Sequence, residues 1–184
     1  MDDRLTIEEQ QQLLEAARSR RHGNGSLYRH SVRDEFLLWL MINGGLTSTQ
    51  VCWLGCADVR APYTEITIAG KRDEVLRPVP LLSVLPWVFV EHVKDASSQG
   101  LYLFNLSTEQ VRRMVRSYGF RSRIARVITP RTLRRTYAHE FFARKRNLPS
   151  LARALGFKDV RSAATYLSSD VGGENNLQYN PEGL

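Results

Sequence analysis

The chain has 184 residues, of which 42% are hydrophobic and 24% charged, the composition of an ordinary globular protein with one core. Its apolar runs fall short of the roughly 18 residues that a membrane helix needs, and its acidic, polar start is not a signal peptide. Cys52 and Cys56 have no second cysteine pair beside them, so we predict reduced cysteines, no metal site and no cofactor. We therefore expect a cytoplasmic protein without membrane contact.

The charge of the chain is unevenly distributed. The net charge is +7, from 26 Lys and Arg against 19 Asp and Glu. Between Arg112 and Arg146, twelve basic residues accompany a single acid, Glu140. An arginine-rich basic stretch is the electrostatic footprint of nucleic-acid binding, because planar guanidinium groups fit phosphate oxygens. The same stretch also fits a solvated, solubilising face, and composition alone leaves both interpretations open.

Helical patterns dominate the first third of the chain. A capping box from Thr6 to Glu9 opens the first predicted helix, which has an apolar inner face. The second is strongly apolar and is stopped by the glycine pair at 44–45. The three helices predicted here cover residues 6–20, 31–42 and 48–54.

The rest of the chain predicts one hairpin followed by more helices. Two β-rich segments, 65–69 and 75–79, flank a turn at 70–74. A brief extended stretch is expected at 101–104, and further helices over residues 81–93, 107–118, 130–146, 149–155 and 160–167. We therefore predict a mainly α fold with a small antiparallel β-hairpin (an α+β arrangement). It forms a single domain over residues 1–167, followed by a flexible tail over residues 168–184.

The most informative motif is the segment 128–138, which contains Arg131 and Arg134 and is followed by Tyr166, 32 residues after Arg134. With the hairpin segment "ITIAGKRDEVLRPVP", it resembles the C-terminal signature of tyrosine recombinases (phage integrases), which cut DNA through a 3′-phosphotyrosyl linkage. The resemblance extends from Leu5 to Tyr166 and implies a helical catalytic domain with a small antiparallel sheet. Full recombinases carry an additional N-terminal clamp domain, for which we expect this chain to have no room.

The resemblance implies a role for each matching residue. Tyr166 takes the position of the nucleophile, and Arg134 that of the second phosphate-binding arginine. Lys71, in the hairpin turn, matches a lysine that reaches the minor groove and is a candidate acid for the departing 5′-oxygen. Arg131 replaces the usual histidine of the motif. A guanidinium group binds phosphate but hardly transfers protons near pH 7, which weakens one proton-transfer role.

Three further positions, in two motifs, depart from the family pattern. Thr47 stands where the family has its first arginine, with Gln50 in the place of an acid, and Phe157 replaces a third histidine. Loss of one preorganised donor typically costs ~10²–10³ in rate, so these changes predict an eroded active site. Other arginines that could fill the gap are Arg33, Arg60 and Arg135.

We expect double-stranded DNA as the partner, together with self-association or a partner recombinase. The basic residues expected on DNA are Arg112, Arg113, Arg121, Arg123, Arg126, Arg135, Lys158 and Arg161. On this interpretation the chain is a mobile-element or plasmid accessory or regulatory factor. The alternative is an active recombinase that forms its phosphotyrosyl intermediate through Tyr166, with the missing donors replaced by other arginines or by a partner protein.

Residues 148–167 also fit a helix-turn-helix pattern. Its turn would lie at Gly156–Phe157, and Arg161 and Ser162 would begin a recognition helix in the major groove. This second alternative makes the chain a transcriptional regulator but leaves Lys71 and the arginine motif unexplained. A noncatalytic interaction module without DNA would rest on the acidic N-terminal helix alone.

Overall fold

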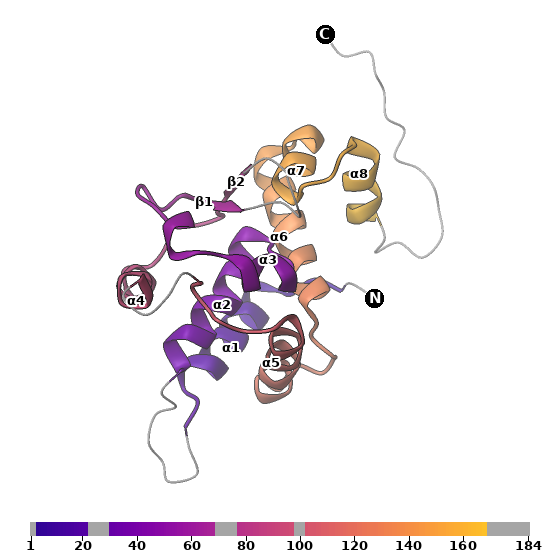
Figure 1. Cartoon of the computed structure of the whole chain (residues 1–184). Helices are drawn as coiled ribbons and strands as arrows, with labels where there is room; N and C mark the ends of the chain where they lie inside the picture. Colours follow the sequence, from indigo (N-terminus) through magenta and orange to yellow (C-terminus); the bar gives the residue numbers. More distant parts are fainter. Residues whose placement is uncertain (1–2, 22–29, 69–76, 98–101, 169–184) are drawn as a thin grey trace, which may run out of the picture.

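The computed structural model describes residues 3–21, 30–68, 77–97 and 102–168, and within these ranges the fold is mainly helical (Figure 1). Strands β1 (Glu65–Ile68) and β2 (Arg77–Pro80) form a two-stranded antiparallel sheet in which Ile66 pairs with Val79. The expected fold class is therefore confirmed. The helices are α1 (Ile7–Arg18), α2 (Ser31–Gly44), α3 (Ser48–Trp53), α4 (Trp87–Ser97), α5 (Thr108–Arg121), α6 (Pro130–Lys145), α7 (Leu148–Leu155) and α8 (Val160–Ser168), with a 3-10 turn at Cys56–Asp58.

Some expectations fall on residues that the structure does not describe. Lys71 and the hairpin turn at 70–74 lie outside the described ranges, as do residues 169–184 of the predicted tail. Within the described ranges, none of the helices has both the length and the apolar character needed to cross a membrane.

Helix α2 is the centre of the molecule. Its residues from Phe36 to Ile42 are all buried, because α1, α4 and α6 pack around it. A helix that is apolar on every side is the expected occupant of a core. Phe36 stacks on Phe89 of α4, with ring centroids 4.7 Å apart. This packing gives α6, which carries the arginine motif, a rigid support.

A buried carboxylate connects α2 to α5. The Tyr118 hydroxyl donates to Asp34 Oδ2 at 2.7 Å, and Arg33 donates to Asp34 Oδ1 at the same distance. Burial, with the hydrogen bond to Asp34, raises the pKa of Tyr118, so its hydroxyl remains a donor at neutral pH. Buried polar groups need such partners. Arg33 is therefore part of this structural network.

The acidic N-terminal segment is a partner for part of the basic stretch. Arg126, in the turn before α6, donates to Glu9 Oε2 at 2.7 Å across 117 residues of sequence. The backbone N–H of Leu5 donates to Thr136 Oγ1 of α6 at 2.8 Å. Some of the positive charge counted in the sequence is thus matched inside the molecule.

The helix predicted over residues 81–93 is wrong at its start. Helix α4 begins only at Trp87, directly after Pro86, whose carbonyl accepts from the N–H of Phe89 at 2.9 Å. Proline fits the first turn of a helix and interrupts its interior, so the apolar run divides at this residue. The part before it, residues 81–86, is irregular and bends at Leu82 and Ser83, and the N–H of Leu82 donates to the Asn43 carbonyl at 2.8 Å.

Gly45 ends α2 in a left-handed conformation, with φ +62°, which L side chains rarely adopt. A Cβ atom here would meet the ring of Tyr137 at 2.4 Å. We predict that Gly45→Ala lowers the free energy of unfolding by about 2–4 kcal/mol, from backbone strain plus overpacking. Denaturant unfolding measures this. Gly55→Ala is the control, since Gly55 has an ordinary φ of −85°; equal effects at both positions would contradict the prediction.

Candidate functional site

Helix α6 presents two arginines of the motif on one side. It begins at Pro130, and the preceding Thr129 caps it by accepting from the N–H of Thr132 at 3.2 Å. Arg131 and Arg134 are one turn apart, so both point toward the same neighbours. The Arg131 side chain is exposed, whereas that of Arg134 is partly buried.

The Arg134 guanidinium group joins three segments of the chain. Nη1 donates to the Gly45 carbonyl and Nη2 to the Leu155 carbonyl, each at 2.6 Å. Nη1 also lies 3.5 Å from Gln50 Oε1. Burial lowers the pKa of Arg134, and a guanidinium group stays charged at neutral pH after such a shift. The charge therefore sits at a fixed place between the start of α3 and the end of α7.

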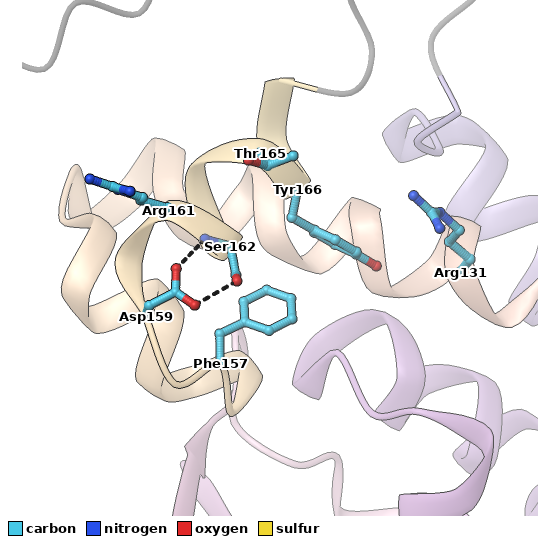
Figure 2. A pocket seen from close by; sticks show the side chains of 7 residues that line it. All are labelled: Arg131, Phe157, Asp159, Arg161, Ser162, Thr165 and Tyr166. Atoms are coloured by element: carbon cyan, nitrogen blue, oxygen red, sulfur yellow. Dashed lines mark hydrogen bonds between the residues drawn. The ribbon is translucent and has the colours of Figure 1, made fainter.

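Tyr166 lies beside both arginines. The Arg131 guanidinium carbon is 5.8 Å from the centre of the phenol ring, and the positive charge of Arg134 also acts on the Tyr166 hydroxyl. Figure 2 shows the hydroxyl directed toward Arg131. Burial raises the pKa of Tyr166, and the positive charges of Arg134 and Arg131 hold that rise back. The hydroxyl is consequently protonated at neutral pH.

The site is a hollow beside α8. It has a volume of about 380 Å³ and is lined by Arg131, Phe157, Asp159, Arg161, Ser162, Thr165 and Tyr166 (Figure 2). At the start of α8, the Asp159 carboxylate accepts from the N–H and the hydroxyl of Ser162, at 2.8 and 2.9 Å. Arg161 extends away from Tyr166 (Figure 2). Among the described residues, no group of three His, Cys, Asp or Glu could hold a metal ion.

A neutral capping box occupies the start of α3. The Thr47 hydroxyl accepts from the N–H of Gln50 at 3.2 Å, and Gln50 Oε1 accepts from the N–H of Thr47 at 2.9 Å. Gln50 Oε1 is also the atom that lies near Arg134. The two residues that stand in the positions of an arginine and an acid thus stabilise the helix and one another without charge.

The arginines named as possible replacements are engaged elsewhere. Arg33 binds Asp34, and the exposed Arg60 donates Nε to the Ala57 carbonyl at 2.6 Å. Arg135 is only 4% exposed. The side chain lies within the packed part of α6, and its contact with DNA stays a prediction.

The third departure, Phe157, is a packing residue of the site. Its ring centroid is 5.6 Å from that of Tyr166 and 5.7 Å from the guanidinium carbon of Arg134. The ring supplies no hydrogen bond. It holds the phenol and the guanidinium group in place through packing and a cation–π contact.

The remaining residues predicted on DNA divide into two groups. The side chains that are exposed belong to Arg112, Arg113, Arg121, Arg123, Lys158 and Arg161. Arg126 is partly buried, and Glu9 already binds its charge. Sequence reasoning missed Arg77, which donates Nη1 to the Ala154 carbonyl of α7 at 2.6 Å. Its only signal was its place in the hairpin motif, after Lys71.

Comparisons with known proteins identify the family of the chain. The profile of the Phage integrase family matches residues 3–172, so the chain belongs to that family. The chain is 25% identical to tyrosine recombinase XerD of Staphylococcus epidermidis in an alignment over 146 residues. This alignment covers 73% of this chain and 49% of that protein. It is 23% identical to tyrosine recombinase XerA of Pyrococcus horikoshii over 145 residues, 74% of this chain and 50% of that one. The chain spans about half the length of these curated relatives.

Solved structures show the same fold. XerA recombinase superimposes with a TM-score of 0.76 at 21% identity, over 90% of this chain and 60% of that one. XerH recombinase bound to its difH substrate gives 0.71 at 18% identity, over 89% and 49%. The lambda integrase catalytic core gives 0.59 at 17% identity, over 85% and 92%. The fold is that of a tyrosine recombinase catalytic domain.

The two motif arginines should differ in their effect on stability. We predict that Arg134→Ala lowers the free energy of unfolding by about 2–4 kcal/mol, because two buried carbonyls lose their donor. Arg131→Ala should change it by less than about 0.5 kcal/mol, since this side chain is exposed. Chemical denaturation of both variants tests the difference, and a destabilising Arg131→Ala with a neutral Arg134→Ala would refute it.

Proposed function

We propose that this chain is a DNA-binding protein that holds a phosphodiester at Arg131, Arg134 and Tyr166 and cleaves it poorly. The observation that carries the proposal is the neutral capping box of Thr47 and Gln50 beside the anchored Arg134. The site thus combines a phosphate-binding arginine pair with the loss of a cationic donor. In biological terms we propose an accessory or regulatory factor of a mobile element or plasmid.

The binding half of the proposal rests on the two guanidinium groups. Arg134 has five N–H donors, and the carbonyls of Gly45 and Leu155 take two of them. These bonds fix its plane, so a phosphate can bind without the cost of ordering the side chain. Arg131 adds a second charge at the exposed rim of the same hollow. Charge-assisted bonds from arginine are the strong contacts available to a phosphate oxygen.

Weak cleavage follows from the missing chemistry. In-line attack needs a deprotonated phenol, charge stabilisation on both non-bridging oxygens, and an acid for the leaving 5′-oxygen. Burial keeps the pKa of Tyr166 above its ordinary value, and Phe157 and Thr47 offer neither a proton nor a charge. Lys71 remains the candidate acid on the basis of the family resemblance.

A wider basic surface would supply further phosphate contacts. Arg112 and Arg113 on α5 are exposed, as are Arg121 and Arg123 at its end. Two structural neighbours support DNA as the ligand by their own complexes: XerH is bound to difH, and lambda integrase is bound to a core site as a dimer. We extend both properties, DNA binding and self-association, to this chain as part of the proposal.

A second function has its own supporting observation. The Tyr166 hydroxyl is directed toward Arg131 (Figure 2), and the positive charges of Arg134 and Arg131 both act on it. This is the arrangement that a nucleophile needs, and an active recombinase would result if a partner supplied the missing donor. The helix-turn-helix alternative has less support, because α7 and α8 lie within the segment that matches the recombinase family and because this alternative leaves Arg131 and Arg134 unexplained.

Binding to a random-sequence duplex should depend steeply on salt. If about six basic residues meet phosphates, affinity falls ~10³-fold between 50 and 200 mM salt. Arg113→Ala and Arg131→Ala should each reduce the logarithmic salt slope by about 1. Lys94→Ala is the control, since this exposed cation on α4 is paired with Glu91. An affinity that stays constant across this salt range would rule out phosphate-dominated binding.

Cleavage can be tested with a nicked suicide duplex that traps a phosphotyrosyl adduct. We expect the unmodified chain to form little adduct. The double variant Thr47→Arg with Phe157→His should form ~10²-fold more adduct or above, because the first change adds a cationic donor and the second adds a group that can transfer protons. Adding Tyr166→Phe to that variant should abolish the adduct and serves as the control. Efficient adduct formation by the unmodified chain would favour the active recombinase instead.

A further inference from the structure

Two guanidinium groups hold the last carbonyls of α7. Arg77, the first residue of β2, donates Nη1 to the Arg153 carbonyl at 2.9 Å and to the Ala154 carbonyl at 2.6 Å. Arg134 of α6 holds the next carbonyl, that of Leu155. The final carbonyls of a helix lack partners within it, and cations are favoured at this end. The end of α7 is therefore held by Arg77 from the sheet and by Arg134 from α6. These two guanidinium groups form the α7 clamp.

The clamp sets the turn that leads to α8. Gly156 follows with φ +73°, and the N–H of Phe157 donates back to the Ala152 carbonyl at 2.8 Å. A Cβ atom on Gly156 would lie 2.8 Å from Arg77 Nη2. The Arg77 guanidinium group thus packs directly on the glycine, and both its bonds and its position define the path of the chain at this point.

Strand β2, which carries Arg77 of the α7 clamp, is itself bonded to α6. The Tyr137 hydroxyl of α6 donates to the Pro80 carbonyl at the other end of β2, at 2.8 Å. Strand β2 is therefore attached to the helix that carries Arg134. Figure 1 shows β2 next to α7, on the side of the molecule where α6 ends.

We propose that Arg77 is a positioning residue for Tyr166. By fixing the end of α7 and the Gly156 turn, it places Phe157, and through this ring the phenol of Tyr166, against Arg134. The relevance of this geometry to DNA rests on the proposed function, but the anchoring itself does not. Arg77 is not among the residues that line the hollow beside α8, and on this proposal it acts through α7.

Hydrogen exchange of the DNA-free protein tests the anchoring. Arg77→Ala should raise amide exchange in residues 148–168 by about tenfold or more, because the turn opens locally, while exchange in α2 stays unchanged. Arg153→Ala is the matched control: its exposed side chain lines the same hollow of about 730 Å³ as Arg77, and its backbone carbonyl is retained. Unchanged exchange in residues 148–168 of Arg77→Ala would overturn the proposal.

DNA binding adds a readout that a purely structural role would not change. Arg77→Ala should weaken duplex binding about fivefold in the natural background and not in a Tyr166→Phe background, since coupled residues give non-additive effects. Arg77→Lys keeps the charge but loses the two-carbonyl geometry, so it should restore little of either effect. If Arg77→Lys fully restored the affinity for duplex DNA while amide exchange in residues 148–168 stayed fast, Arg77 would contact DNA through its charge. That result would refute a positioning role. If Arg131→Ala leaves DNA binding intact, the proposed function fails, while the exchange result still decides the role of Arg77.

Discussion

The site depends on one buried interaction, the placement of the Arg134 guanidinium group between the carbonyls of Gly45 and Leu155. These atoms belong to the end of α2, the middle of α6 and the end of α7, so one side chain sets the distances among three elements. The bonds make Arg134 both a structural support and a fixed positive charge. A charge that is already ordered and partly desolvated interacts with a phosphate more strongly than a mobile surface arginine would.

On the proposed function, the groups around Arg134 support phosphate binding more than strand cleavage. Arg131 and Arg134 hold a phosphate on this proposal, whereas Thr47 is a helix cap and Phe157 is a packing ring. Both residues satisfy local structure: the cap supplies hydrogen bonds to the start of α3, and the ring packs against Tyr166.

Local patterns in the sequence predicted most of the fold. The capping box at Thr6, the glycine stop after α2 and the hairpin are all set by residues close in sequence, and the motif spacing predicted the family. Contacts that depend on tertiary packing could not be predicted in this way. The pairing of Arg126 with Glu9 and the burial of Arg135 leave no mark in the local pattern, and the clamp by Arg77 joins residues 77 positions apart. The predicted start of α4 was wrong for another reason: the apolar pattern continues across Pro86, whereas the helix begins only after this proline.

The central claim, that a phosphodiester binds where Arg131, Arg134 and Tyr166 meet, can be tested directly by NMR of protein labelled with ¹³C at tyrosine Cζ. The Tyr166 resonance is assigned with Tyr166→Phe, and random duplex is added at low salt. The account predicts that the Tyr166 signal shifts on binding and returns at high salt, while those of the buried Tyr118 and Tyr137 stay in place. If the Tyr166 signal stayed in place while the protein was saturated with DNA, the phosphodiester would not bind beside Tyr166.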